Sequence, residues 1–512
     1  MNHANIIISK AQVDGSRLAV RLGQQTLTYG EFVAESEALS IGMRQAGINK
    51  ADRVMMYAEN SIEHLVVYHA LARIGAIFAP VHPDFRAQEL DYAVSNAKPQ
   101  LIITSAQLLP AVESALQKAS HISEIVILCE DGVEPPSEIY RKFSDLRSEV
   151  GKLPPEDVEP NHPLLISYTS GTSSLPKPVL RSHGSETWSA QRYSESWGFK
   201  PDDSILVAMS LSWVYGLCSL CQTALATGAT VVIDKKFSPT RTLELMHRGE
   251  VTAFAGTTSM YSMMLNILQE RSFDTSSMRK LFLGGEPRNE IVISQIEARF
   301  GLRLCEGWAM TESFPALAIH PELDLTAPSA SLGRAVPDVE IRLVDESGVE
   351  VAEGEPGEAL IRSQGDFLCY YNEPGLTEER RTKDGWIRTG DFLSRSADGY
   401  FKFVSRKSEL IIRGGVNISP AEIESAICEH PDVLDAIVVG LPDQVLGEVV
   451  TALITTRADK TVDVDILKEF LELRIAKFKV PAFIISVDVI PKGTTGKKNR
   501  AKAKEIAVAI QP

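Results

Sequence analysis

The segment from residue 164 to residue 179, LLISYTSGTSSLPKPV, carries residue types that can hold a phosphate chain. An apolar run, which predicts a buried strand, leads into a loop of small hydroxyl residues around Gly171, and Lys177 follows the loop. Such a loop offers backbone N–H groups, hydroxyl donors and a cation, which are the groups that phosphate oxygens need. The segment therefore predicts a triphosphate-binding loop, and a plain surface turn is the alternative that its composition leaves open.

This loop differs from the Walker-type phosphate loop. The pattern GxxxxGK[ST] opens a helix directly after the lysine, whereas Pro178 follows Lys177 here. Two other charged residues are candidates for a site. Lys497 lies in a basic, glycine- and threonine-rich stretch that by itself is typical of a solvated charge run, and Asp391 follows a glycine as turn residues do. Residue type alone does not decide the role of either one.

The elements that must position these residues alternate between strands and helices. Residues 52–58 and 76–81 are apolar runs of strand length, and residues 62–74 between them have helical spacing, which indicates a β-α-β unit. The alternation recurs up to about residue 300, so we expect parallel sheets with helices on both faces. The predicted fold class is α/β.

The pattern changes after about residue 335, where short alternating runs broken by turn signals predict a β-rich subdomain. A second helix-and-strand unit follows, and its first helix is predicted to begin with Ser419 as N-cap and Glu422 closing a capping box. We therefore expect a large N-terminal domain over residues 1–407 and a small α+β domain over residues 408–512.

Composition and charge exclude several classes of protein. A net charge of −15 opposes binding to a phosphate backbone or an anionic membrane, so nucleic acid is not expected as a ligand. Six cysteines in 512 residues are too few for a disulfide scaffold and indicate a reducing compartment. The sequence shows no secretory leader at its start and no stretch typical of a membrane span. We expect a cytoplasmic protein without an integral membrane segment.

Six stretches together resemble the adenylate-forming superfamily of acyl-CoA synthetases, amino-acid adenylation domains and firefly-type luciferases. After the phosphate loop come, in the family's order, an adenine-side loop, an aromatic-x-x-Thr-Glu motif, a ribose-binding aspartate segment, a hinge segment and a catalytic-lysine loop. In this sequence they are LFLGGEP (281–287), GWAMTES (307–313), GWIRTGD (385–391), SRKSELIIRGGVNISPAEIE (405–424) and PKGTTGKKNR (491–500).

The resemblance implies a two-step reaction. A small carboxylic acid attacks the α-phosphate of ATP with loss of pyrophosphate, and the acyl-adenylate then passes to the thiol of coenzyme A. ATP, Mg²⁺ and coenzyme A are the expected cofactors. The first transition state spreads negative charge over phosphate and carboxylate oxygens, which positioned cations and N–H donors stabilise. Loading of the acid onto the phosphopantetheine of a separate acyl carrier protein is the alternative.

The resemblance also implies roles for individual residues. Lys497 would bridge the carboxylate and the α-phosphate, Thr311 would donate to the α-phosphate, and Glu312 would ligate Mg²⁺, a hard cation that prefers oxygen. Asp391 would accept hydrogen bonds from the ribose, with Arg406 as its partner. The other residues expected to bind ATP are Thr169, Ser170, Gly171, Thr172, Lys177, Gly284, Gly285, Glu286, Pro287 and Trp308.

Several positions depart from the family's pattern. Ser173-Ser174 and Pro178 replace glycine-containing positions of the loop, and Trp308 replaces the usual adenine-stacking tyrosine while keeping a π face. Trp213 stands where the family has a histidine or an aspartate beside the acyl pocket. Without a carboxylate there, the ammonium group of a free amino acid has no partner, so amino-acid activation is not expected. Because a tryptophan side chain is bulky and flat, we expect a compact or planar acid rather than a long-chain one. An ordinary core role for Trp213 is the alternative.

The hinge and the coenzyme A side have their own candidates. Ser408 stands where the hinge commonly has Asp or Lys, and small residues absorb dihedral changes readily. Gly414 and Gly415 would let the pantetheine approach the backbone closely. The sequence has no GxSxG elbow, no HExxH helix and no GxGxxG, which argues against a hydrolase or a nicotinamide dehydrogenase. The sequence does not identify the acid, the pathway or the oligomeric state.

Overall fold

The computed structural model describes residues 2–119, 121, 124–129, 133–148, 150–169, 175–286, 288–413, 416–457, 460–492 and 498–510. The chain divides into two compact units. The first comprises Met1–Glu340 and Ile361–Ile387, and the second comprises Ile341–Leu360 and Arg388–Pro512. The boundary after residue 407 and the hinge at Ser408 stay predictions.

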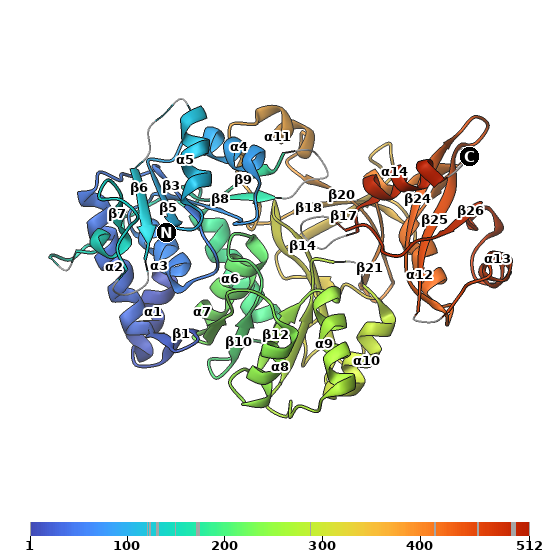
Figure 1. Ribbon diagram of the computed structural model, residues 1–512, viewed down its shortest axis with the longest axis horizontal. Coiled ribbons are helices and arrows are strands. Elements are labelled where there is room, and N and C mark those ends of the chain that lie inside the picture. The colour runs from blue at the N-terminus through green and yellow to red at the C-terminus, as the bar shows by residue number, and fades with distance from the viewer. Residues whose placement is uncertain are drawn as a thin grey trace. The chain divides into compact units, whose positions relative to one another are not determined.

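One sheet of the first unit carries both ends of the predicted phosphate loop. β3 pairs in parallel with β4 and β5, and β4 pairs in parallel with β8, as the β-α-β alternation predicts. β9 runs antiparallel to β8 and brings Lys177 opposite Thr169. In order across the sheet, the strands are β19 (Cys369–Tyr370), β9 (Lys177–Ser182), β8 (Pro163–Thr169), β4 (Ile77–Val81), β3 (Arg53–Tyr57), β5 (Leu101–Ser105), β6 (Glu124–Leu128) and β7 (Arg141–Lys142) (Figure 1).

A second large sheet of the first unit carries the motifs at 281–287 and 307–313. Its central strands are parallel, and its last two strands form an antiparallel extension of β14. In order, the strands are β16 (Arg334–Ala335), β15 (Ser313–Ala318), β14 (Leu304–Met310), β13 (Lys280–Leu283), β12 (Ala253–Gly256), β10 (Ser204–Val207), β11 (Thr230–Ile233), β1 (Leu18–Leu22) and β2 (Gln25–Thr28). These parallel sheets confirm the predicted α/β class.

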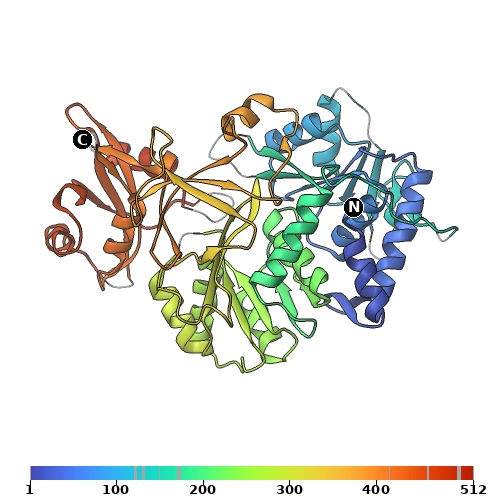
Figure 2. The same ribbon diagram turned by 180° about the vertical axis from the view of Figure 1, so that it is seen from behind.

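Helices connect and cover the strands of the first unit. Helix α9 packs between α8 and α10, and Figure 1 shows the three beside the sheet that contains β12, which Figure 2 shows from behind. The helices are α1 (Asn5–Asp14), α2 (Tyr29–Gln45), α3 (Ile62–Arg73), α4 (Ala87–Ala97), α5 (Leu109–Lys118), α6 (His183–Ser196), α7 (Thr223–Thr227), α8 (Pro239–His247), α9 (Thr258–Glu270), α10 (Glu290–Phe300) and α11 (Pro374–Arg380). A short 3-10 helix spans Phe143–Leu146, and a π-helix, η2 (Tyr215–Gln222), precedes α7.

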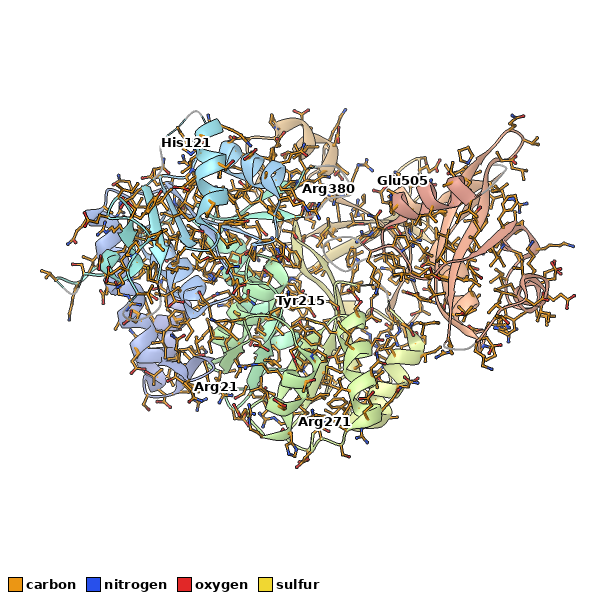
Figure 3. All side chains as sticks on the ribbon, viewed as in Figure 1. Arg21, His121, Tyr215, Arg271, Arg380 and Glu505 are labelled. Carbon is orange, nitrogen blue, oxygen red and sulfur yellow. The ribbon has the colours of Figure 1, made fainter. Side chains whose placement is uncertain are left out.

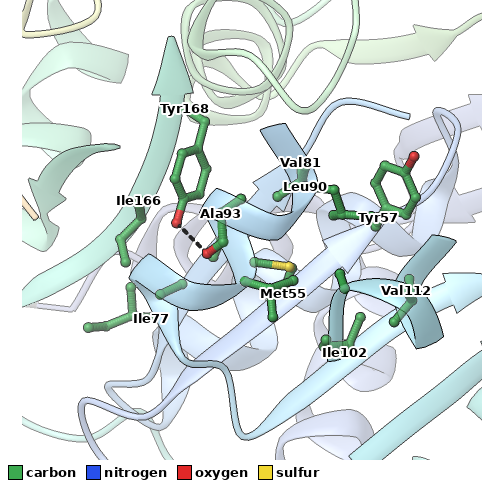
Figure 4. Close-up of a cluster of buried hydrophobic side chains, with 14 of the residues drawn as sticks. Met55, Tyr57, Ile77, Val81, Leu90, Ala93, Ile102, Val112, Ile166 and Tyr168 are labelled. Carbon is green, nitrogen blue, oxygen red and sulfur yellow. Dashed lines mark hydrogen bonds between the residues drawn. The ribbon is translucent and has the colours of Figure 1, made fainter. Parts of the chain in front are cut away.

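The core beneath the phosphate-loop strands is apolar and close-packed. Side chains from β3, β4, β5 and β8 pack against α4 and α5, which removes their surface from water. Tyr168, next to the end of β8, donates its hydroxyl to the Ala93 carbonyl of α4 at 3.1 Å (Figure 4). This cluster includes Met55, Ile77, Leu90, Val94, Ile102, Val112 and Ile166.

The second unit has a small sheet, which the sequence analysis counted with the N-terminal domain, and an α+β module. The strands of the small sheet are β17 (Glu340–Val344), β18 (Gly357–Arg362), β20 (Ile387–Arg395) and β21 (Phe401–Arg406), and most of their residues belong to this unit. The module's strands are β23 (Val416–Ile418), β22 (Ile411–Arg413), β25 (Gly447–Thr456), β24 (Val433–Asp443) and β26 (Phe483–Ser486). Its helices are α12 (Pro420–Cys428), α13 (Val464–Glu472) and α14 (Arg500–Ile510), and 3-10 turns span Lys407–Glu409 and Lys477–Lys479.

Helix α12 begins where the sequence predicts, but its predicted capping box is wrong. The Ser419 hydroxyl donates to the Val404 carbonyl at 2.5 Å and makes no cap hydrogen bond within the helix. The Glu422 carboxylate accepts from Lys479 Nζ at 2.7 Å. Both side chains therefore have tertiary partners, which a local motif cannot reveal.

Candidate active site

The hairpin of β8 and β9 places Thr169 and Lys177 opposite each other, because they are paired in the strand register. Lys177 Nζ lies 5.7 Å from the centroid of the Tyr370 ring, within the range of a cation–π contact. Ser170, Gly171 and Thr172, which the sequence places between the strands, lie outside the described residues, so their phosphate-binding role stays a prediction.

Thr311 and Glu312 lie in the turn between β14 and β15. Glu312 is only 5% exposed. Its carboxylate accepts a hydrogen bond from the Tyr370 hydroxyl, and Arg380 Nη2 lies 3.3 Å from the same carboxylate oxygen. Its backbone carbonyl accepts from the Phe367 N–H at 2.7 Å. The carboxylate is thus oriented by two residues, Tyr370 and Arg380, that the sequence analysis missed.

The protonation of this cluster follows from burial and charge. Burial raises the pKa of Tyr370, and the neighbouring Glu312 carboxylate raises it further, so its hydroxyl stays a donor. Burial alone would lower the pKa of Arg380, but the Glu312 carboxylate outweighs it and the pKa is raised. Lys177 also lies near the Tyr370 ring, so two cations and one carboxylate lie close to a single phenol. Figure 3 labels Arg380.

The glycine segment after β13 lies against Tyr215. Gly285 has a φ of +80°, in the left-handed region that favours glycine, and a Cβ on Gly284 would lie 3.1 Å from the Tyr215 hydroxyl oxygen. Glu286 accepts from the backbone N–H and the hydroxyl of Ser259, each at 2.8 Å, so it holds the first turn of α9. Pro287 lies outside the described residues.

Tyr215 is a third residue that the sequence analysis missed. Its hydroxyl oxygen is buried and has no hydrogen-bond partner within the described part of the chain. Tyr215 opens the π-helix η2, and π-turns inside helical segments are frequent at functional sites. Its place in SLSWVYG, two residues after Trp213, is the signal that could have identified it. Figure 3 labels Tyr215.

Trp213 and the adenine-side Trp308 differ in their surroundings. Trp308 on β14 is buried, whereas Trp213 is half-buried and stacks on His82, with ring centroids 4.5 Å apart and an interplanar angle of 17°. Burial lowers the pKa of His82. The nearby Asp84 carboxylate acts in the opposite direction, but burial outweighs it. His82 is a further residue that the sequence analysis missed.

In the second unit, Asp391 and Arg406 are paired across β20 and β21. Arg406 Nε lies 3.4 Å from Asp391 Oδ1, and the Asp391 N–H donates to the Thr389 hydroxyl at 3.0 Å. Their proposed contact with ribose stays a prediction. Gly414, Gly415 and Lys497 lie outside the described residues.

The basic stretch around Lys497 is partly tied to carboxylates. Lys498 Nζ lies 2.8 Å from Asp435 Oδ1, and Arg500 contacts Glu424. Burial lowers the pKa of Lys498, but Glu424 and Asp435 outweigh burial and raise it. These two cations are therefore structural members of the second unit rather than free surface charge.

Glu312 is the group of this cluster that could ligate Mg²⁺, since Tyr370 and Arg380 beside it are hydrogen-bond donors and not metal ligands. The described residues contain no group of three His, Cys, Asp or Glu side chains that could hold a metal ion by themselves. Mg²⁺ is commonly held by one or two carboxylates together with substrate phosphates and water, so the single carboxylate of Glu312 fits this mode.

None of the described helices is long and apolar enough to cross a membrane.

Comparisons with known proteins identify the family. A model of the AMP-binding enzyme family matches residues 9–371, and a model of its C-terminal domain matches residues 422–497. The chain belongs to the AMP-binding enzyme family. It is 30% identical over 498 residues to the indoleacetate–CoA ligase of Aromatoleum aromaticum, covering 97% of this chain and 96% of that protein. It is 30% identical over 497 residues to a feruloyl-CoA synthase of Amycolatopsis, covering 96% of both chains.

The solved structures agree with this assignment. The crystal structure of ATP-bound MatB from Rhodopseudomonas palustris superposes with a TM-score of 0.90 at 27% identity, covering 99% of both chains. Members of this family activate a carboxylic acid as an acyl-adenylate, and its CoA ligases transfer the acyl group to coenzyme A. The resemblance inferred from the six motifs, and the activity class that it implies, are therefore confirmed.

Proposed function

We propose that the chain is an AMP-forming acyl-CoA synthetase for a planar, aromatic carboxylic acid. The observation that carries the proposal is the cluster around Tyr370, whose hydroxyl binds Glu312 and whose ring lies beside Lys177. It joins two segments that are far apart in sequence into one charged site. The match to the AMP-binding enzyme family supports this assignment.

The residues of the first unit have distinct tasks in the acid-activating step. Lys177 binds the β- and γ-phosphates, and Thr311 donates to the α-phosphate while the acid's carboxylate oxygen attacks phosphorus and pyrophosphate leaves. Trp308 stacks on the adenine. Mg²⁺ held by Glu312 would neutralise phosphate charge, which is the chemistry that it supplies when bound. Preorganised charges of this kind provide most of the acceleration in phosphoryl and adenylyl transfer.

The second unit contributes to the nucleotide and to the second step. Asp391 accepts from the ribose hydroxyls, and Lys497 bridges the carboxylate and the α-phosphate in the first transition state. In the second step the thiol of coenzyme A attacks the acyl carbon and AMP leaves. Gly414 and Gly415 allow the pantetheine to approach, and Ser408 is the hinge between the two steps.

The planar substrate is supported by two observations. Trp213 presents a flat ring, stacked on His82, at the position that the family uses beside the acyl group. The relatives named above are, by their names, ligases for indoleacetate and ferulate, both acids that carry a planar aromatic ring. The same position has no carboxylate for the ammonium of an amino acid, which argues against amino-acid activation.

The deciding experiment measures acid-dependent pyrophosphate release from MgATP across aromatic, short-chain and long-chain acids, with coenzyme A present and absent. We expect the highest kcat/KM for an aromatic acid, and AMP and acyl-CoA as products. Replacing coenzyme A by a phosphopantetheinylated carrier protein tests the alternative acceptor. Absence of acid-dependent pyrophosphate release with every acid would contradict the proposal.

A further inference from the structure

A buried ion pair lies in the interior of the first unit. The side chains of Arg181 on β9 and Glu186 on α6 are both 0% exposed, and Arg181 Nε donates to the Glu186 carboxylate. Tyr68 on α3 donates its hydroxyl to the other carboxylate oxygen at 3.2 Å. Packed apolar side chains often match or exceed the stability of a buried ion pair, so this pair calls for a role other than stability.

The rest of the Arg181 guanidinium binds the chain at several points. Nη1 donates to the carbonyl of Gly365 at 2.9 Å and to the carbonyl of Thr311 at 3.2 Å. Nη2 donates to the Ser189 hydroxyl at 3.2 Å, and Cζ lies 3.7 Å from the centroid of the Phe314 ring. One side chain therefore holds two backbone segments that are far apart in sequence.

These two segments converge on Glu312. Thr311 directly precedes it, and Gly365 lies two residues before Phe367, whose N–H donates to the Glu312 carbonyl. Tyr370, farther along the same segment, binds the Glu312 carboxylate. Arg181 thus ties both segments around Glu312 to the strand that begins with Lys177.

The packing at Gly365 leaves little room for these segments to shift. A Cβ at this position would lie 2.3 Å from the Phe314 carbonyl oxygen and 2.7 Å from the Trp188 ring. A side chain could not fit there without moving the backbone. Close packing against Phe314 and Trp188 and the hydrogen bond from Arg181 to the Gly365 carbonyl therefore fix the same point of this segment.

We propose that Arg181 is a positioning residue for acid activation, and that it fixes Thr311 and Glu312 relative to Lys177 while Glu186 holds its guanidinium in place. The proposal rests on the proposed function, because it takes Thr311 and Glu312 to act on the phosphates of ATP. A planar guanidinium has five donors in a fixed fork, which serve a carboxylate, a hydroxyl and two carbonyls together. A lysine ammonium offers three donors from one point.

The test compares the two half-reactions in Arg181→Lys, which keeps the charge and loses the fork. We expect adenylate formation to slow by about 100-fold, because a small displacement of reacting groups has effects of that order. Transfer of the acyl group from supplied acyl-adenylate to coenzyme A should change far less. Glu186→Gln weakens the ion pair that holds the guanidinium. This variant should also slow adenylate formation, but by less than Arg181→Lys does.

A matched control separates positioning from folding. Lys280 and Asp203 form another buried ion pair in the same unit, with side chains 4% and 0% exposed and an Nζ–Oδ2 distance of 2.6 Å. Lys280→Met should lower the melting temperature and leave the ratio of the two half-reaction rates unchanged.

The proposal is wrong if Arg181→Lys lowers the melting temperature but leaves that ratio as in the wild type. If Arg181→Lys does not fold, the ratio of the two half-reaction rates is measured in Glu186→Gln instead, and an unchanged ratio there also overturns the proposal. A wild-type protein that releases no pyrophosphate with any acid would instead overturn the proposed function, and the positioning role with it. The two failures are therefore distinguishable.

Discussion

The Tyr370 hydroxyl donates a hydrogen bond to the Glu312 carboxylate across 58 positions of sequence. Glu312 belongs to the motif at 307–313, and Tyr370 belongs to the edge strand β19, which pairs with β9. The orientation of the carboxylate therefore depends on a strand that also contacts the end of the phosphate-loop hairpin. This contact makes Tyr370 a link between two motifs that sequence reasoning treats separately.

Replacing Tyr370 by Phe removes this link and keeps the ring beside Lys177. We expect adenylate formation to slow by about tenfold or more, since a hydrogen bond to a charged group contributes about 1.5 to 3 kcal/mol. Acid-dependent pyrophosphate release measures the effect. Tyr92→Phe is the matched control, because the Tyr92 hydroxyl binds Glu373 at 2.8 Å and does not contact Glu312. Equal losses in both variants would contradict the prediction.

Lys497→Ala should abolish most adenylate formation and leave acyl transfer from supplied acyl-adenylate largely intact. The charge of the lysine is needed only while negative charge builds up on the α-phosphate and the carboxylate. Single-turnover assays of each half-reaction measure the two effects. Lys502→Ala serves as the control, because Lys502 pairs with Glu505 on the surface. Similar losses in both half-reactions would reject the role of Lys497.

The sequence identifies the parts of the site that are local in the chain. The strand leading to Thr169, the lysine after the loop and the Thr-Glu pair all lie within short motifs, and the α/β class follows from alternating apolar runs. Tyr370 and Arg380 are 58 and 68 positions away from Glu312, so no periodicity or motif connects them to it. The pairing of β19 with β9 and the hydrogen bond from the Phe367 N–H to the Glu312 carbonyl help to bring them together.

The sequence also does not reveal which polar residues are buried. Arg181 and Glu186 look like surface charges in the sequence, since such residues are rarely buried unless paired. The capping box at Ser419 fails for a related reason, because Val404 and Lys479 bind the two side chains that the motif would join. In each case a tertiary partner outweighs the local preference.

Glu312→Gln should weaken the Mg²⁺ dependence of the rate, because a neutral amide is a poorer ligand for a hard cation. It also replaces the carboxylate that pairs with Arg380 by a neutral amide, so some loss of stability is expected. Titrations of Mg²⁺ at fixed ATP, together with the rise in melting temperature on adding MgATP, separate the two effects. An unchanged Mg²⁺ dependence would show that Glu312 is not the ligand.

Four buried histidines predict a loss of stability in acid. Burial lowers the pKa of His64 from 6.5 to about 3 and that of His3 to about 4, and it also lowers those of His69 and His183. The unfolded chain takes up protons near pH 6.5, and the folded chain does so only well below it. The contribution of these neutral histidines to the free energy of unfolding is therefore complete above about pH 6.5, and it is lost as the pH drops towards 4.

Denaturant unfolding between pH 8 and pH 5 measures this slope. His64→Gln removes one such group and should flatten the slope by up to about 1.4 kcal/mol per pH unit. His247→Gln is the control, because His247 is exposed. If His64→Gln leaves the slope as steep as the wild type, burial of the neutral histidines does not cause the acid sensitivity.

Trp213→Ala tests the acyl pocket. Trp213 is half-buried and stacked on His82, so its removal vacates a flat volume beside that ring. If this volume bounds the pocket, the variant should accept bulkier acids and lose kcat/KM on the native acid, because a compact substrate is then poorly positioned. Trp213→Phe keeps a flat ring and should retain the native order of preference.

Measuring kcat/KM for a graded series of aromatic acids, together with a melting curve, distinguishes a pocket role of Trp213 from a core role. A tryptophan that serves only the core predicts a loss of about 3 to 5 kcal/mol in stability with the order of acids unchanged, and that result would refute the pocket assignment.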